Sequence, residues 1–165
     1  MYLLDTDIVL ELRNAKTSGA DPGLASWAAG VSRTSLFISA ITLLDLETAV
    51  AQLARKDKVA GLALRNWLDN QVGPAFDGRI LPVDAAIVRR RAHLPQAEGR
   101  DALLAATALE HGLTVVTRNV ASFKAGRVKV FNPLGYKPEA MGDDEDWGQA
   151  AKAGSHWLRN IFVRG

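Results

Sequence analysis

The sequence predicts one α/β domain in which a central, mainly parallel five-stranded sheet carries helices on both faces. Its 165 residues are enough to bury a substantial core in a single domain. Hydrophobic residues make up 48% of the chain and charged residues 23%, which is ordinary for a globular protein and argues against disorder. Short apolar segments alternate with segments of helical spacing, a pattern typical of a parallel sheet with helices between its strands.

The individual elements follow from the spacing of the apolar residues. Five short apolar segments are predicted to be strands: Tyr2–Leu4, Ser35–Ala40, Arg79–Val83, Leu113–Val116 and Arg127–Phe131. Helices are predicted between them at Ile8–Asn14, Leu43–Ala54, Gly61–Val72, Ala85–Leu94 and Ala102–His111. Sites in open parallel sheets form beyond the carboxyl ends of the strands. The polar residues that follow the strands are therefore the first candidates for a functional site.

The composition and the missing motifs exclude several classes of function. The chain contains no cysteine, which excludes disulfides, thiolate metal sites and a thiol nucleophile. The phosphate-binding, dinucleotide-binding and serine-hydrolase glycine motifs do not occur. We find no apolar stretch long enough to cross a bilayer and no basic segment before the first apolar run. We therefore expect a cytoplasmic protein that does not associate with membranes.

Three carboxylates and one amide stand where the site is expected. Asp5 follows the first predicted strand, Asp45 lies in the first turn of the helix after the second, Asp101 opens a later helix, and Asn119 follows the fourth strand. Each of them has an alternative local role. Asp5 and Asn119 suit turns, Asp45 has the spacing of a capping box with Thr42, and Asp101 suits a helix N-terminus.

Their common location favours a metal site over four unrelated local roles. Two carboxylates about 4 Å apart would repel each other by roughly 4 kcal/mol at an effective dielectric of 20. A divalent cation removes that cost, and ligands that are all oxygen favour Mg²⁺ or Mn²⁺ over zinc. Such a site predicts metal-assisted phosphoryl chemistry. Thr6 and Arg118, which adjoin Asp5 and Asn119, are candidates for contact with a substrate phosphate.

Five segments make the sequence resemble the PIN domain, specifically the VapC-type toxin ribonucleases of bacterial type II toxin–antitoxin pairs. They occur in the family's order and cover residues 1 to about 135: "LLDTDIVLEL", "ISAITLLDLETAV", "GRILPVD", "RDALLAATALEHGLTVVTRNVASF" and "VFNPL". The resemblance implies a three-layer α/β/α fold and Mg²⁺- or Mn²⁺-dependent endonucleolytic cleavage of RNA by metal-activated water. It also implies a VapB-like antitoxin as partner and a homodimer. The family's acids fall on Asp5, Asp45 and Asp101 as catalytic and metal-binding residues, with Asn119 as a weaker metal ligand.

The sequence departs from the family pattern at three positions. Asp45 replaces a glutamate, Asn119 replaces a frequent aspartate, and Asp7 stands where the family usually has asparagine. Asp7 is expected to cap its helix, and we hypothesise that its charge compensates for the charge missing at Asn119. The alternative function is a catalytically weak PIN-fold protein that binds RNA or a partner. A phosphohydrolase of another acidic α/β family is a third possibility, but no nucleophile motif supports it.

The chain is predicted to consist of a nuclease domain, residues 1–135, and a C-terminal extension, residues 136–165. The extension has acidic residues near its start, basic residues toward its end, and apolar residues that predict a partly helical segment. It is expected to pack on its own domain or on a dimer partner. A more specific hypothesis is that it shields the acidic site or contacts the antitoxin.

Overall fold

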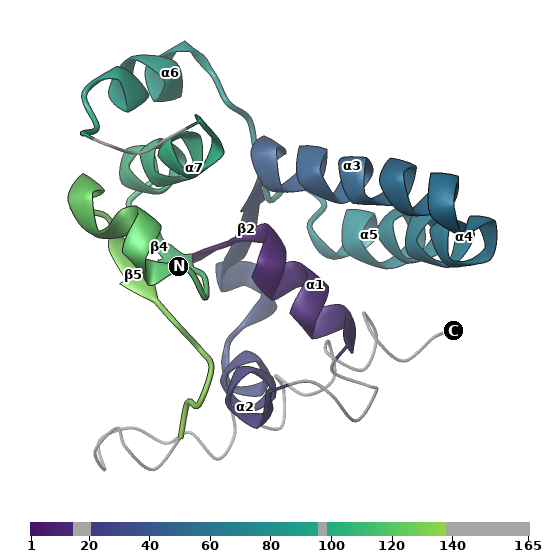
Figure 1. Ribbon diagram of the computed structural model, residues 1–165. Coiled ribbons are helices and arrows are strands. Elements are labelled where there is room, and N and C mark those ends of the chain that lie inside the picture. Colours follow the sequence, from purple (N-terminus) through teal and green to yellow (C-terminus); the bar gives the residue numbers. More distant parts are fainter. Residues whose placement is uncertain (15–20, 96–98, 138–165) are drawn as a thin grey trace.

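The computed structural model describes residues 1–14, 21–95 and 99–137 (Figure 1). Within these residues five strands form one sheet, and every neighbouring pair is parallel. The strands are β1 (Tyr2–Leu4), β2 (Leu36–Ser39), β3 (Ile80–Leu81), β4 (Thr114–Val116) and β5 (Lys129–Phe131), in the order β3–β2–β1–β4–β5. The predicted parallel five-stranded sheet is confirmed.

The order of the strands locates the carboxyl-edge crevice. Leu4 at the end of β1 is in register with Ile38 of β2 on one side and with Val116 of β4 on the other. The chain leaves β1 toward β2 and β3, and it later returns to add β4 and β5 on the opposite side of β1. The topological switch point therefore lies between β1 and β4, which is where open α/β sheets bind their ligands.

Helices occupy most of the remaining described chain. They are α1 (Thr6–Asn14), α2 (Pro22–Gly30), α3 (Ala40–Lys56), α4 (Lys58–Trp67), α5 (Gly73–Ala75), α6 (Ala85–Ala92) and α7 (Gly99–Glu110). A π-helical turn, Leu68–Val72, joins α4 to α5, and 3-10 turns lie at Arg33–Ser35 and Val120–Gly126. No helix in the described part of the chain is long and apolar enough to cross a membrane.

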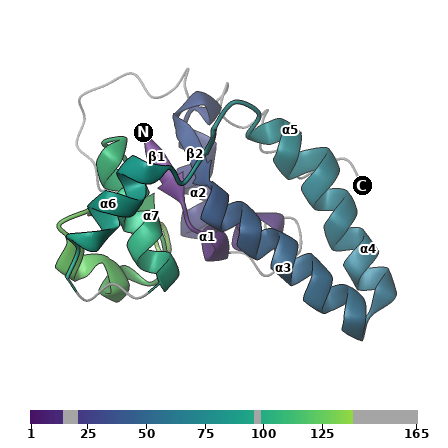
Figure 2. The same ribbon diagram turned by 90° about the horizontal axis from the view of Figure 1, so that it is seen from above.

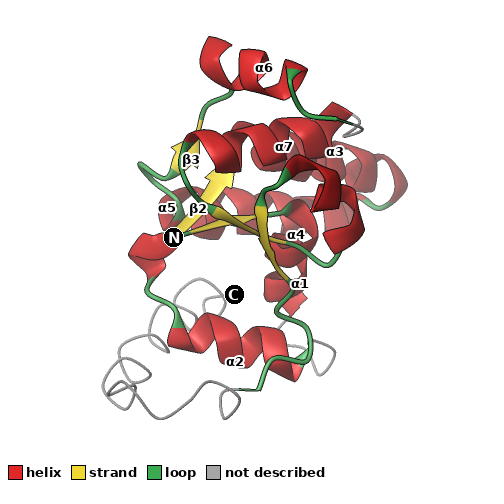
Figure 3. Cartoon of the chain, turned by 90° about the vertical axis from the view of Figure 1, so that its left-hand side faces the viewer, coloured by secondary structure: helices red, strands yellow, loops and turns green. Residues whose placement is uncertain are grey.

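The sheet separates two hydrophobic cores. Leu4 and Val116 pack with residues of α1, α2, α3 and α4, whereas their strand neighbours Leu3 and Val115 pack with residues of α7 and with Phe123. Successive residues of a strand point to opposite faces, so adjacent apolar residues serve both cores. Figure 2 shows α6 and α7 on one side of the strands and α3 and α4 on the other, and in Figure 3 α7 lies above the strands and α2 below them. The expected three-layer α/β/α architecture is confirmed.

Several predicted boundaries differ from the structure because side chains outside the predicted helices act as caps. α3 begins at Ala40 and not at Leu43, since the Ser39 hydroxyl accepts a hydrogen bond from the Ile41 amide (3.2 Å). Asp45 consequently lies in the second turn of the helix. The capping box proposed for it is wrong, because the Thr42 hydroxyl donates to the Leu4 carbonyl (3.2 Å) instead.

The sequence analysis did not predict α2. Its signals are nevertheless local: Asp21 accepts hydrogen bonds from the Gly23 and Leu24 amides, and Pro22 occupies the first helical position. The same Asp21 carboxylate also accepts from the Gly135 amide (3.0 Å), so it fastens the segment after β5 to α2. The predicted extension lies outside the described residues from residue 138 onward, so the domain division stays a prediction.

Candidate active site

A pocket of about 630 Å³ opens at the carboxyl edge of the sheet, where β1 and β4 end. Its lining comes from the loops after these two strands, from α1 and from the start of α7. The residues are Asp5, Thr6, Asp7, Leu10, Glu11, Asn14, Arg100, Asp101, Arg118 and Asn119. Segments more than ninety residues apart in sequence are brought together here by the parallel pairing of β1 with β4.

Asp5 lies at the base of this pocket and is only 8% exposed. Its amide continues the strand ladder by donating to the Val116 carbonyl (3.0 Å). Its Oδ1 accepts from the Thr6 amide (2.7 Å) and its Oδ2 from the Thr117 hydroxyl (2.8 Å). The carboxylate is therefore held in one orientation by two donors.

The pKa of Asp5 is raised above its ordinary value. Burial is the largest cause, because it penalises the charged form, and the negative charges of Asp7 and Asp101 raise the pKa further. The hydrogen bonds from Thr117 and Thr6 lower the pKa and offset part of this effect. The three carboxylates of Asp5, Asp7 and Asp101 are therefore electrostatically coupled within one pocket.

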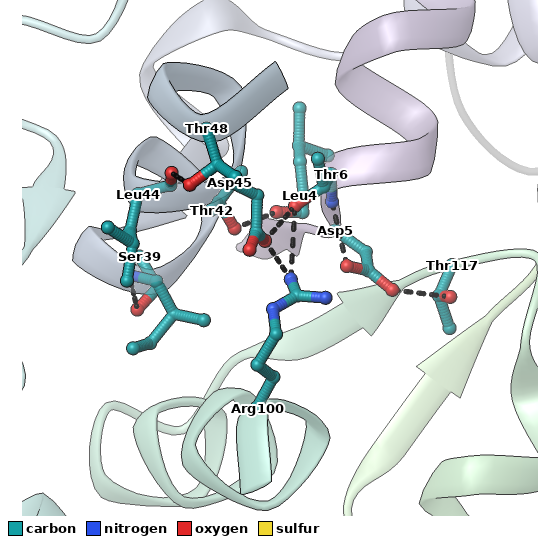
Figure 4. A network of polar contacts seen from close by, with 11 residues as sticks. Leu4, Asp5, Thr6, Ser39, Thr42, Leu44, Asp45, Thr48, Arg100 and Thr117 are labelled. Atoms are coloured by element: carbon teal, nitrogen blue, oxygen red, sulfur yellow. Dashed lines mark hydrogen bonds and ion pairs between the residues drawn. The ribbon is translucent and has the colours of Figure 1, made fainter. Parts of the chain in front are cut away.

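Asp45 lies beside the pocket and is linked to it by two residues that do line it (Figure 4). The Thr6 hydroxyl donates to Asp45 Oδ2 (2.7 Å), and the Arg100 guanidinium forms an ion pair with the same oxygen. Arg100 Nη2 also lies 3.4 Å from Thr6 Oγ1. Thr6 thus contacts both acids, Asp5 through its amide and Asp45 through its hydroxyl.

Arg118 lines the pocket and is held there by two acids of α1. Its backbone amide and its Nε both donate to Asp7 Oδ2, at 3.1 and 3.2 Å, and its Nη1 lies 3.7 Å from Glu11 Oε2. Asp7 therefore binds the loop after β4, a role different from the predicted capping of its own helix. The other Asp7 oxygen, Oδ1, is buried and accepts no hydrogen bond from the described residues.

Asn119 is held by its neighbours in the same loop. Its backbone amide donates to the Thr117 hydroxyl (3.0 Å), and its side-chain Nδ2 donates to Ser122 Oγ (2.5 Å). Since the amide nitrogen is engaged with Ser122, Oδ1 is the atom that Asn119 can offer to a ligand.

Comparison with known proteins identifies the family. A sequence model of the PIN domain matches residues 2–126. The chain belongs to the PIN domain family. Toxin FitB of Neisseria gonorrhoeae is 36% identical over 141 residues, which are 81% of this chain and 98% of that protein. A VapC ribonuclease of Sinorhizobium fredii is 32% identical over 142 residues, 81% of this chain and 97% of the relative.

Solved PIN-domain structures have the same fold. The crystal structure of FitAcB from Neisseria gonorrhoeae aligns with a TM-score of 0.72 at 33% identity, over 81% of this chain and 98% of that one. The structure of FitAB bound to the IR36 DNA fragment aligns with a TM-score of 0.73 at 29% identity, over 84% of this chain and 99% of that one. About a fifth of this PIN protein has no counterpart in these alignments.

The structure brings most of the predicted site residues of this PIN domain together. Asp5, Asp101 and Asn119 line the pocket, as do Thr6 and Arg118, the predicted phosphate contacts. Asp45 does not line it. In addition, the guanidinium of Arg118 and the hydroxyl of Thr6 are already engaged with acids of the site. Whether any of these residues binds metal or RNA stays a prediction.

Sequence reasoning missed two charged residues that line the pocket, Glu11 and Arg100. Glu11 follows Asp7 by four positions on α1, so helical spacing alone places both carboxylates on one face. That signal was available in the sequence. Arg100 precedes Asp101 directly, and nothing in its sequence neighbourhood indicates that it pairs with Asp45.

The donor chemistry of the pocket fits the divalent cation that the PIN family resemblance implies. Three coupled carboxylates face one space, the buried Asp7 Oδ1 has no partner among the described residues, and Asn119 offers an amide oxygen. No three acidic or histidine side chains of the described chain converge tightly enough to ligate one ion together. Mg²⁺ commonly uses only one or two protein carboxylates and completes its coordination with water and phosphate, so this arrangement suits it.

Proposed function

We propose that this PIN protein is a Mg²⁺- or Mn²⁺-dependent endoribonuclease, the toxin of a toxin–antitoxin pair. The observation that carries the proposal is the group of coupled carboxylates of Asp5, Asp7 and Asp101 in a pocket at the switch point of a PIN fold. The naming of relatives as a toxin and as a VapC ribonuclease supports the same activity.

The residues divide the work of phosphodiester hydrolysis. Asp5 and Asp101 would hold the cation, with Asn119 Oδ1 as a weaker neutral ligand. Asp45 lies beside the pocket in an ion pair with Arg100 and would join the ligands only when that pair opens. A divalent cation held there supplies a Lewis acid that lowers the pKa of water and offsets charge on the phosphate. Two hydrogen bonds hold the Asp5 carboxylate in a fixed direction, which preorganises the site.

The test is cleavage of a labelled RNA titrated with Mg²⁺ or Mn²⁺ and stopped with EDTA. We expect activity that requires the cation and falls by at least about 100-fold in Asp101→Asn. Asp84→Asn is a matched control, because Asp84 is also an aspartate at a helix start but caps α6 through the Ile87 amide. Cleavage that is indifferent to both the metal and Asp101→Asn would refute the proposal.

A catalytically weak PIN-fold binding protein is the second candidate. The neutral Asn119 and the ion pair that engages Asp45 favour it. It predicts RNA binding, measured by fluorescence anisotropy, without cleavage at saturating Mn²⁺. Asn119→Asp separates the two candidates: a large gain of cleavage on restoring the acid supports a weakened enzyme, and an unchanged low rate supports a binding protein.

The proposed function also includes a partner, an assembly and a compartment. Solved relatives are complexes such as FitAB, so we propose a VapB-like antitoxin for this chain, homodimerisation and a cytoplasmic location. Co-expression with the short reading frame adjacent to the gene, followed by affinity purification, tests the partner. Light scattering of the purified chain tests the dimer.

A further inference from the structure

Two arginines line the acidic pocket, and their ion pairs differ in a way that suggests different roles. Both side chains are 49% exposed. Arg118 is bound by two acids of the same helix, and its backbone amide also donates to one of them. Within the described residues, Arg100 pairs with one acid, Asp45, and makes this contact through Nη2.

The Asp45 oxygen that binds Arg100 is also the oxygen that accepts from Thr6. A divalent cation bound to this carboxylate would lie beside the positively charged Arg100 guanidinium, and the two cations would repel each other. Arg100 can leave easily because half of its side chain is already in solvent and because one acid holds it. Arg118 would have to break contacts with both Asp7 and Glu11 to move.

The charge of the pocket gives the displaced guanidinium a function. The described lining contains four carboxylates, from Asp5, Asp7, Glu11 and Asp101, against two guanidiniums. A pocket with this net negative charge repels an RNA backbone. A divalent cation would bring the net charge of this lining to zero and so remove the repulsion. The planar fork of an unpaired Arg100 is then well suited to bind a phosphate through two hydrogen bonds.

We propose that Arg100 and a divalent cation are alternative partners of Asp45, and that the displaced Arg100 guanidinium binds a phosphate of the RNA substrate. Arg100 would then couple RNA binding to loading of the cation. This inference rests on the proposed function, and it adds a substrate-binding residue that the sequence did not indicate.

The first experiment measures Mn²⁺ affinity by electron paramagnetic resonance on the intact chain without RNA. Arg100→Gln should bind Mn²⁺ about fivefold more tightly than wild type, because a competitor for Asp45 is gone. In an Asp45→Asn background the same change should alter affinity less than about twofold. Arg118→Gln controls for the general field and should have the same effect in both backgrounds. An Arg100→Gln gain that is absent, or equally large without Asp45, overturns the proposal.

The second experiment measures RNA cleavage at saturating Mg²⁺. Arg100→Gln should raise KM about tenfold with a smaller change in kcat, and Arg100→Lys should restore part of the loss because it keeps the charge. A merely structural role would not tighten Mn²⁺ binding while weakening RNA binding. An unchanged KM overturns the proposal. If the wild-type chain binds Mn²⁺ but cleaves no RNA, the proposed function fails by itself, and anisotropy with Mn²⁺ then replaces KM as the measure of RNA affinity.

Discussion

Gly23 on α2 provides a direct test of how the segment after β5 is held against the domain. A Cβ added at this position would lie 2.2 Å from the Tyr136 backbone nitrogen and 2.6 Å from that of Gly135. Ordinary van der Waals contact begins at about 3.5 Å, so the backbone of this segment would have to move away by about 1 Å. Gly23→Ala therefore forces α2 and the segment apart.

The cost can be worked out from the contacts that would be disturbed. Overpacking against backbone atoms costs about 3 kcal/mol, because no flexible side chain can move away. The segment also carries Tyr136, whose ring packs edge-on against Phe131 at 6.2 Å, a pair worth about 1 kcal/mol. Alanine improves helix propensity by about 1 kcal/mol. The expected net loss is about 3 kcal/mol, or a fall in Tm of about 9 °C for a domain of this size.

Gly30→Ala is the matched control, because Gly30 ends the same helix and an added Cβ there meets nothing within 4 Å. It should leave stability unchanged or raise it by up to about 1 kcal/mol. The assay is thermal and urea unfolding followed by circular dichroism at pH 7. Equal stabilities for Gly23→Ala and Gly30→Ala would contradict the expected clash with the Tyr136 backbone, since helix propensity alone predicts the same effect for both.

Three further predictions follow from the same structure. Asp5→Asn should raise the free energy of unfolding at pH 7 by about 1 kcal/mol, because it removes the charge of a buried carboxylate whose pKa is raised by burial and by Asp7. The same variant should lose metal-dependent cleavage. Urea unfolding in the presence of EDTA measures the change in stability. The folded protein binds the Asp5 proton more tightly than the unfolded chain does, so the stability of the wild type should contain a component that decreases as pH rises above about 4. The variant should lack this pH dependence. Asp21→Asn should have the opposite pH dependence, because backbone amides, that of Gly135 first, lower the pKa of Asp21. In the wild type this carboxylate contributes stability above about pH 4 that is lost as pH falls further. The acid side of the Tm–pH profile should therefore be flatter in the variant. Gly61→Ala should destabilise the helical hairpin by about 1–2 kcal/mol in urea unfolding, because its Cβ would meet Ala54 of α3 at 2.5 Å, and a neutral result would contradict that close packing.

The fold was predictable because its strands are short apolar segments with helical segments between most of them. The boundaries that failed depend on single hydrogen bonds, such as the one from Ile41 to Ser39 that starts α3 three residues early. α2 was missed because its Gly- and Ala-rich sequence has little amphipathic character. Asp21 and Pro22 nevertheless indicate where it starts. The tail from residue 138 lies outside the described residues, and its predicted roles stay predictions.

The location of the candidate site follows from sequence alone for a physical reason. Parallel strands end at one edge of their sheet, so acids that directly follow β1 and β4, or begin the helix α7, must approach one another there. This rule placed Asp5, Asp101 and Asn119 in one pocket without any knowledge of distances.

The pairing of the charges in the site depends on the tertiary structure. Arg100 contacts Asp45 across 55 positions of sequence, and Arg118 contacts Asp7 across 111. No helical or strand period links residues so far apart. The direction of each side chain also depends on how α1, α3 and α7 pack against the sheet. Sequence alone therefore indicates that Asp5, Asp101 and Asn119 meet at the carboxyl edge. The packing of the helices determines which acids hold an arginine and which remain available to a cation.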